Sequence, residues 1–164
     1  MNHPYDTIEL NNGAKLIFTP CPGTRNTSLT AAVETLAQAG TTALVTAMPL
    51  EELALNGVDA LPQVSQSLGI KWIHLPVEDD KSPEQLFTTQ LQQHKAGLLG
   101  LIKDKATIAI HCKGGSGRTG LIAAVLLLES GENWQNVKSQ IQSIRPKALT
   151  LAVHLDFLSA NYSL

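Results

Sequence analysis

The sequence predicts one α/β domain in which a mostly parallel sheet of about four or five strands is flanked by helices. Short apolar or β-branched runs at residues 42–46, 71–75 and 107–110 alternate with segments of helical periodicity, an order typical of parallel strands joined by crossover helices. A chain of 164 residues with 43% hydrophobic composition and no long polar tract can build one sizeable core but has no room for a second domain. We therefore expect residues 1–164 to fold as a single unit.

The first 40 residues are expected to form a β-ribbon and a first surface helix. Two β-type runs, 7–10 and 15–18, flank a turn signal at Asn12-Gly13. Apolar residues then recur at helical spacing over 29–36. The residues predicted to bound this helix are a capping side chain and a final glycine, namely Asn26 or Thr27 and then Gly40.

Three helices are predicted between the strands of the middle segment. Two short ones cover 49–53 and 61–68, and a long one runs from the capping-box pattern at 82–85, with proline at its first helical position, toward Lys103. Glu51 and Glu52 lie in a first helical turn, where carboxylates complement the helix dipole, so we do not expect them to be catalytic. His74, in the strand at 71–75, is expected to be a packed or rim histidine rather than a base.

An acidic loop, residues 76–83, follows the strand at 71–75 and contains Glu78, Asp79 and Asp80. In an open α/β sheet, ligands bind at the carboxyl ends of the strands, so this loop is free to approach such a site. A carboxylic acid on a mobile loop suits proton donation to a leaving group. The alternative is a solvated charge cluster next to a helix start.

The most informative stretch is 106–120, where an apolar strand delivers Cys112 to a glycine-rich bend and a helix begins near Arg118. Gly114, Gly115 and Gly117 are expected to take positive φ and to turn backbone N–H groups toward one point, forming an anion cradle with the helix N-terminus. Such dipoles favour a thiolate, and the planar fork of Arg118 can grip two oxygens of a tetrahedral oxyanion. The alternative is that Cys112 is an inert core residue.

The helix at 121–128 is apolar all round, so we expect it to be the buried central helix. A further helix is expected to start at Glu132 or Asn133, to bury Trp134 as a core residue, and to end at Arg145-Pro146. A last helix covers 151–162.

The composition excludes several classes of partner. A formal net charge of −2 with scattered lysines and arginines provides no footprint for nucleic acid or a membrane surface. Nothing approaches a membrane span or a signal peptide, and two cysteines are too few for a disulfide scaffold. We therefore expect a cytoplasmic protein whose Cys21 is structural. No metal or cofactor is expected, because Arg118 and the backbone N–H groups of the loop supply the charges that the site needs. A redox pairing of Cys21 with Cys112 stays open.

His111, Cys112, Arg118, Thr119 and Gly120 match the signature His-Cys-x5-Arg-Ser/Thr-Gly, so this stretch resembles the cysteine-dependent protein phosphatases. The acidic loop is similar to the general-acid loop of the cyclin-dependent kinase-associated phosphatases, a dual-specificity-like group. The similarity also takes in Glu52-Leu53, Leu61-Pro62 and Gly69-Ile70, so it covers roughly 41–162 and extends more weakly through Pro20 to Gly23. It implies a single phosphatase domain over 1–164, with 41–162 as the catalytic core.

This resemblance implies hydrolysis of a phosphate monoester through a cysteinyl-phosphate. Cys112 would be the nucleophile and Asp79 the general acid. Thr119 would hydrogen-bond the sulfur and His111 would brace the loop. The residues expected to hold the phosphate are Lys113, Gly114, Gly115, Ser116, Gly117 and Arg118. Related phosphatases often have a glutamine where this chain has His154, so a water-positioning role at that site is in question.

Other functions stay open at this level. Lys113 could favour polyanionic substrates, so a phosphoinositide or small-phosphomonoester phosphatase is an alternative to a tyrosine or dual-specificity phosphoprotein phosphatase. Arsenate reduction or sulfur transfer would use a similar cysteine-arginine loop without Asp79. A phosphate-binding interaction module without turnover is the alternative from another class. The oligomeric state is not determined by any of these features.

Overall fold

The central sheet has the strand order β1-β2-β5-β3-β4 in the computed structural model, which describes residues 2–164. The strands are β1 (Asp6–Glu9), β2 (Lys15–Thr19), β3 (Thr41–Thr46), β4 (Lys71–His74) and β5 (Thr107–His111). Only β1 runs antiparallel to its neighbour, and the β2-β5, β5-β3 and β3-β4 pairs are parallel. The predicted fold class, a mostly parallel sheet of four or five strands, is confirmed.

The N-terminal ribbon is part of this sheet. Its turn forms as predicted, with Gly13 at φ +96° and the Asn12 side chain accepting a hydrogen bond from the Ala14 amide at 3.0 Å. β2 then pairs in parallel with β5, so that Thr19 lies opposite His111. The ribbon therefore does more than pack against the domain, because its second strand borders the strand that carries the cysteine.

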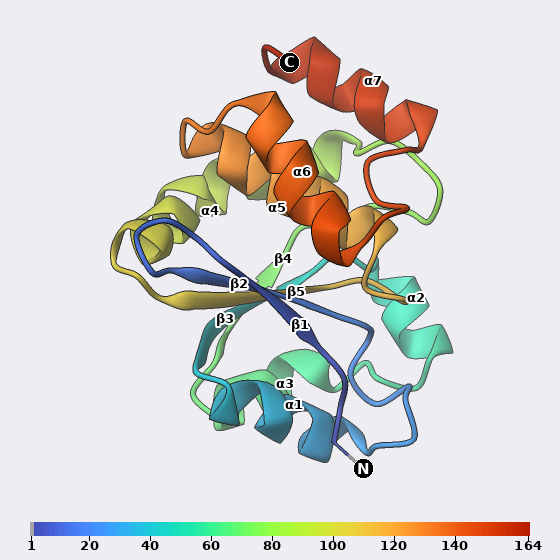
Figure 1. Ribbon diagram of the computed structural model, residues 1–164. Coiled ribbons are helices and arrows are strands. Elements are labelled where there is room, and N and C mark those ends of the chain that lie inside the picture. Colours follow the sequence, from blue (N-terminus) through green and yellow to red (C-terminus); the bar gives the residue numbers. More distant parts are fainter. Residues whose placement is uncertain (1) are drawn as a thin grey trace.

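Helices cover both faces of the sheet (Figure 1). One face carries α1 (Leu29–Gln38) and α3 (Leu61–Ser67), and the other carries α4 (Gln85–Lys103), α5 (Gly117–Glu129) and α6 (Trp134–Ile144). α7 (Ala152–Asn161) forms the outermost layer on the second side, and α2 (Leu50–Leu55) lies beyond the carboxyl end of β3. The loops that follow β3, β4 and β5 therefore meet at one edge.

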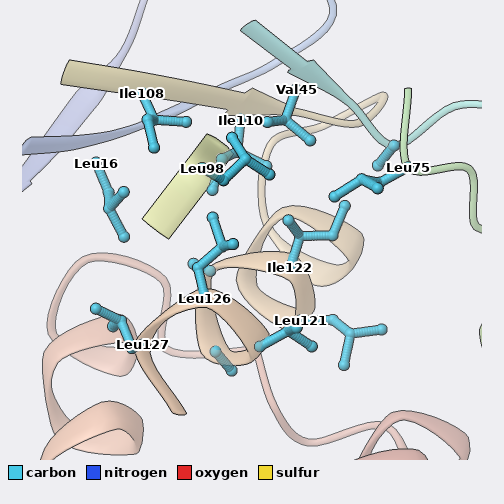
Figure 2. Close-up of a cluster of buried hydrophobic side chains, with 14 of the residues drawn as sticks. Leu16, Val45, Leu75, Leu98, Ile108, Ile110, Leu121, Ile122, Leu126 and Leu127 are labelled. Carbon is cyan, nitrogen blue, oxygen red and sulfur yellow. The ribbon is translucent and has the colours of Figure 1, made fainter. Parts of the chain in front are cut away.

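The larger core lies between the sheet and α5. Figure 2 shows Ile122 and Leu126 of α5 facing Ile108 and Ile110 of β5, with Leu121 and Leu127 on the far side of the helix from the sheet. Because α5 also contacts α4 and α6, its residues from Arg118 to Leu127 are buried all round, as predicted, and Leu128 near its end is half-buried. Each such leucine contributes about 2 kcal/mol by burial, so this core holds α5 firmly against β5.

A second apolar cluster lies on the opposite face of the sheet. It contains Ile17, Leu44 and Ala109 from three neighbouring strands, together with residues of α1 and α3. Side chains alternate between faces along a strand, so β5 supplies Ile108 and Ile110 to the larger core and Ala109 to this one. Both faces are apolar, as expected for a parallel sheet between two helical layers.

Two predicted helix starts are wrong. α1 is capped by Ser28, whose side chain accepts from the Ala31 amide at 3.1 Å, whereas Asn26 has a left-handed φ of 57° that an N-cap does not adopt. The capping box at 82–85 does not form, because residues 80–83 continue the acidic loop. α4 begins at Gln85, with Glu84 as an N-cap whose side chain makes no capping bond.

The C-terminal helices agree with the sequence prediction. Asn133 caps α6 by accepting a hydrogen bond from the Asn136 amide at 2.9 Å. α6 ends at Arg145, directly before Pro146. Trp134 is half-buried and packs against the larger core. No helix within residues 2–164 has both the length and the apolar character needed to cross a membrane.

Candidate active site

The cysteine loop, residues 112–118, joins β5 to α5 at the carboxyl edge of the sheet. Cys112 is 3% exposed, and its Sγ accepts hydrogen bonds from the Gly115 amide at 3.2 Å and from Thr119 Oγ1 at 3.1 Å. The predicted contact between Thr119 and the sulfur is therefore present. α5 starts at Gly117, and the side chain of its N-cap, Ser116, makes no capping bond. The first N–H groups of α5 are thus left without a side-chain cap at the end of the helix that favours an anion.

Only one of the three loop glycines takes the predicted left-handed conformation. Gly115 has φ +81°, and a Cβ there would lie 2.6 Å from the backbone carbon of Thr19, so a side chain cannot fit. Gly114 and Gly117 do not have positive φ, and a Cβ on either would meet no atom within 4 Å. Gly117 already belongs to α5, which requires helical φ. The expectation of positive φ is wrong for these two glycines.

Arg145 braces the cysteine loop from a distance of 30 residues. Its Nε donates to the Gly115 carbonyl at 2.8 Å, and its Nη1 forms an ion pair with Asp6 at 2.7 Å. The guanidinium also lies over the Phe18 ring, 5.9 Å from its centroid. From the sequence, Arg145 is expected only to end a helix. The structure makes it a clamp between the loop and the β1-β2 hairpin.

Glu52 binds one edge of the Arg118 guanidinium. The Arg118 guanidinium is 3% exposed, and its Nη1 and Nη2 donate to the two carboxylate oxygens of Glu52 at 2.7 and 2.9 Å. Nη1 also donates to the Val77 carbonyl at 3.0 Å. Glu52 was predicted only to complement the dipole of α2. That interpretation is incomplete, because Glu52 also binds Arg118. The two residues are 66 positions apart, so no local sequence pattern indicates this contact.

These contacts leave one edge of the guanidinium free. A guanidinium has five N–H donors, and among residues 2–164 the hydrogen bonds of Arg118 use three of them. The remaining two are on Nε and Nη2, which share the second edge of the plane. That edge has the geometry for a bidentate contact with an oxyanion. Burial opposes the charge of Arg118, but the Glu52 hydrogen bonds and the surrounding negative groups outweigh it and raise the pKa of Arg118.

Asp79 is the residue of the acidic loop that approaches this edge. Its Oδ1 lies 3.7 Å from Arg118 Nη2, and its side chain is 72% exposed. Glu78 instead lies 3.9 Å from Lys81 within the loop, and Asp80 occupies a left-handed turn position at φ 60°. Of the three acids that the sequence left open, Asp79 is the one whose carboxylate lies near Arg118.

A directed chain of hydrogen bonds supports the cysteine from the side of β3 and β4. Trp72 Nε1 donates to Thr46 Oγ1 at 2.7 Å, Thr46 Oγ1 lies 2.8 Å from His111 Nε2, and His111 Nδ1 lies 3.1 Å from the Cys112 carbonyl. A carbonyl can only accept, so Nδ1 carries the proton and Nε2 of the neutral ring accepts from Thr46. His111 therefore braces the loop through both nitrogens, and Trp72 and Thr46 extend the chain beyond the predicted residues.

The burial of His111 leads to a prediction about acid stability. Burial lowers the pKa of His111 to about 4, below its ordinary value of 6.5. Between these two values the unfolded chain binds more protons than the folded one, so folding stability falls as the pH is lowered through this window. We expect the free energy of unfolding in urea to be about 2 kcal/mol smaller at pH 5 than at pH 7. A change of His111 to Asn should reduce that difference, whereas an unchanged free energy over this range would contradict the neutral, enclosed imidazole.

The backbone of Cys21 contacts the cysteine loop, but its side chain lies on the other face of the sheet from that of Cys112. Its amide donates to the Lys113 carbonyl at 3.0 Å, yet its side chain belongs to the second apolar cluster, whereas Cys112 faces the larger core. Burial raises the pKa of the Cys21 thiol to about 12, so it is a thiol near neutral pH. Cys21 is therefore a buried, free thiol of the second apolar cluster.

Arg118 is one of the residues that line a cavity of about 240 Å³. Its wall combines the end of the cysteine loop, the tip of the acidic loop and the segment before α7, and includes Ser116, Gly117, Arg118, Asp79, Asp80, Lys147 and His154. Lys113 points elsewhere, since its Nζ donates to Asn56 Oδ1 at 2.7 Å. No group of three or more His, Cys, Asp or Glu side chains suited to a metal ion occurs within residues 2–164.

The sheet with its two helical layers, and a cysteine and an arginine on one strand-loop-helix unit, define the class of cysteine-dependent phosphatase domains. Residues 23–155 match the family model of PTP-SAK, described as the Swiss Army Knife protein, DSP-PTPase phosphatase domain. The chain belongs to this family. The resemblance to dual-specificity-like phosphatases noted from the sequence is thereby confirmed.

One sequence relative is a protein named as a tyrosine phosphatase, 197R, of Invertebrate iridescent virus 6. It is 38% identical over 58 residues, which are 35% of this chain and 22% of the viral protein. The chain thus spans only about a fifth of this relative's length.

Solved structures of phosphatases share the fold. A kinase-associated phosphatase (KAP) with serine in place of its catalytic-site cysteine has a TM-score of 0.83 at 21% identity, over 96% of this chain and 93% of that one. The active form of Tk-PTP has a TM-score of 0.67 at 21% identity, over 88% and 89%. PTPMT1 in complex with PI(5)P has a TM-score of 0.65 at 17% identity, over 88% of each chain. At these identities the likeness establishes the fold.

Proposed function

We propose that this protein hydrolyses phosphate monoesters of phosphoproteins, on tyrosine or with dual specificity, through a cysteinyl-phosphate. The observation that carries the proposal is the pairing of Cys112 with the free edge of Arg118 in one loop. Two donors converge on the Cys112 sulfur, and two N–H groups of Arg118 have no protein acceptor among residues 2–164. A thiolate nucleophile and a bidentate oxyanion clamp are the two groups that this reaction needs.

In the first step, the Cys112 thiolate attacks phosphorus and forms a sulfur-phosphorus bond as the bond to the ester oxygen breaks. Arg118 and the N–H groups at residues 113–118 hold the three equatorial oxygens. The Asp79 carboxylic acid gives its proton to the departing oxygen. Glu52 keeps the guanidinium in place, because its carboxylate occupies the edge of Arg118 that faces away from the substrate.

In the second step, water attacks phosphorus and the sulfur-phosphorus bond breaks, which releases inorganic phosphate and regenerates the Cys112 thiolate. The Asp79 carboxylate takes the proton from that water. Thr119, 3.1 Å from the sulfur, donates a hydrogen bond to the thiolate as it leaves. Asp79 thus returns to its acid form for the next cycle.

The charges around the site favour a phosphoprotein over a phosphoinositide. Exposed carboxylates lie on α2, on the acidic loop and at the start of α4, namely Glu51, Glu78, Asp80 and Glu84. They repel a polyanionic headgroup, and they outnumber the nearby lysines, which are Lys81, Lys113 and Lys147. A catalytic thiolate also requires a reducing compartment, so we propose a cytoplasmic location. Residues 41–162 would carry the reacting groups, with residues 1–40 completing the same domain.

The test of this proposal compares leaving groups across pH. Asp79→Asn is expected to lower kcat/KM for a phosphothreonine peptide about a hundredfold, because an alkoxide cannot depart without a proton. An activated aryl phosphate should lose little, since its phenolate departs unaided. The alkaline limb of the pH–rate profile should also disappear, because that limb reports ionisation of the acid.

Two neighbouring variants serve as matched controls. Glu78→Gln and Asp80→Asn remove one charge each from the same loop, and asparagine tolerates the left-handed conformation of Asp80. Both should keep the alkaline limb. A panel of phosphotyrosine, phosphothreonine and phosphoinositide substrates, run with a chelator, ranks the substrate classes. Equal slowing of both leaving groups in Asp79→Asn would reject Asp79 as the acid, and faster turnover of the phosphoinositide would reject the phosphoprotein assignment.

A further inference from the structure

The tip of the acidic loop has few connections to the rest of the protein. Among the hydrogen bonds of residues 2–164, the backbone of residues 79–82 makes one within the loop, from the Lys81 amide to the Glu78 carbonyl at 3.1 Å. It makes one outside the loop, between the Lys81 carbonyl and His154 Nε2 at 3.1 Å. The remaining link is the Asp79 contact with Arg118, whose 3.7 Å separation exceeds hydrogen-bond length. The contact with His154 is therefore the one hydrogen bond that joins the backbone of residues 79–82 to another part of the described chain.

His154 is built into the fold as a fixed donor. It lies in the first turn of α7 and is 2% exposed. The Lys81 carbonyl can only accept, so Nε2 of His154 carries the hydrogen. The ring also lines the cavity beside Arg118 and Asp79, so this anchor lies at the site itself.

The backbone carbonyl that His154 binds lies close in sequence to Asp79. Lys81 is two residues from Asp79, and Asp80 between them takes a left-handed turn conformation. Fixing the Lys81 carbonyl therefore restricts the backbone on both sides of that turn. Asp79 itself is exposed at its side chain and has no hydrogen-bond partner among the described residues, so it cannot hold the loop unaided.

We propose that His154 is a positioning residue that ties the acidic loop to α7 and thereby holds the Asp79 carboxyl beside the phosphate-binding edge of Arg118. The inference rests on the proposed role of Asp79 as the general acid. It assigns His154 a task in the proton-transfer step, separate from phosphate binding. α7, which contributes none of the reacting groups, then becomes part of the machinery that aligns them.

The experiment uses His154→Phe, which keeps a ring in the buried position, and His154→Ala, which removes it. Both are expected to lower kcat/KM for a phosphothreonine peptide about fivefold, the population shift that loss of one hydrogen bond produces. The activated aryl phosphate should change less than about twofold, because it does not need the acid. The alkaline limb of the pH–rate profile should shrink. His154→Gln keeps an N–H donor of similar reach and should restore much of the loss.

Two comparisons separate positioning from a general structural effect. In an Asp79→Asn background, His154→Phe should cause almost no further loss, because a residue that acts only through Asp79 is not additive with it. Tyr162→Phe removes the hydrogen bond from Tyr162 to Glu129, 2.7 Å long, at the other end of α7. That control should lower thermal stability without changing the leaving-group dependence.

The outcomes are distinct. Equal slowing of both substrates, full additivity with Asp79→Asn, or no effect of His154→Phe and His154→Ala would overturn the role of His154 while leaving the general acid in place. If Asp79→Asn itself leaves the leaving-group dependence unchanged, the acid assignment and the role of His154 both fail. If His154→Ala fails to fold, His154→Phe and His154→Gln decide the question.

Discussion

Cys112→Ser is expected to abolish turnover, with kcat reduced by at least about a thousandfold, while phosphopeptide binding is retained. A serine hydroxyl at neutral pH is a poor nucleophile and cannot form the cysteinyl-phosphate. The oxyanion clamp is untouched, because Arg118 keeps its contacts to Glu52 and Val77. Discontinuous assays of phosphate release measure turnover, and calorimetric titration of this variant with a phosphopeptide measures binding.

Cys21→Ser is the matched control, since the chain has two cysteines and both are buried. Cys21 lies in the second apolar cluster, on the other face of the sheet from the Cys112 side chain. This variant should keep turnover and lower the melting temperature, because a hydroxyl replaces a thiol in an apolar environment. Loss of turnover in Cys21→Ser, together with normal turnover in Cys112→Ser, would identify Cys21 as the nucleophile and contradict the assignment of Cys112.

Arg118→Lys is expected to reduce kcat/KM by about a thousandfold although the charge is conserved. An ammonium group cannot satisfy both Glu52 oxygens and the Val77 carbonyl while offering two parallel N–H groups to a phosphate. The loss should appear in both kcat and oxyanion affinity. Inhibition by vanadate, measured beside steady-state kinetics, reports the affinity separately.

Lys147→Met tests whether positive charge alone explains the effect of Arg118. Lys147 is an exposed cation on the wall of the same cavity. Its removal should change kcat/KM by no more than about twofold, because an exposed lysine acts only through a screened field. Near-normal rates in Arg118→Lys, or an equal loss in Lys147→Met, would reduce the arginine to a source of surface charge.

The helix ends show which features could be predicted from local sequence patterns and which could not. Asn133 and Ser28 both cap helices. Asn133 was one of the two predicted starts of its helix, whereas Ser28 was not predicted, because several polar residues precede α1 and the left-handed conformation of Asn26 cannot be recognised from composition. The capping box before α4 failed for a related reason. Residues 80–83 belong to the acidic loop, and the Lys81 carbonyl there is hydrogen-bonded to His154 of α7, a contact that no local pattern shows.

The sequence by itself determined the α/β class and the order of the groups in the cysteine loop. Strand, cysteine, glycines, arginine and helix are contiguous there, so their spacing already implies that Cys112 and Arg118 share one loop. Only the tertiary structure decided which distant groups support it. Glu52 holds Arg118, Arg145 clamps Gly115, and the Trp72-Thr46 pair supports His111. These contacts join residues far apart in the chain, and such pairs form only when the sheet and its helices pack, so no local pattern encodes them.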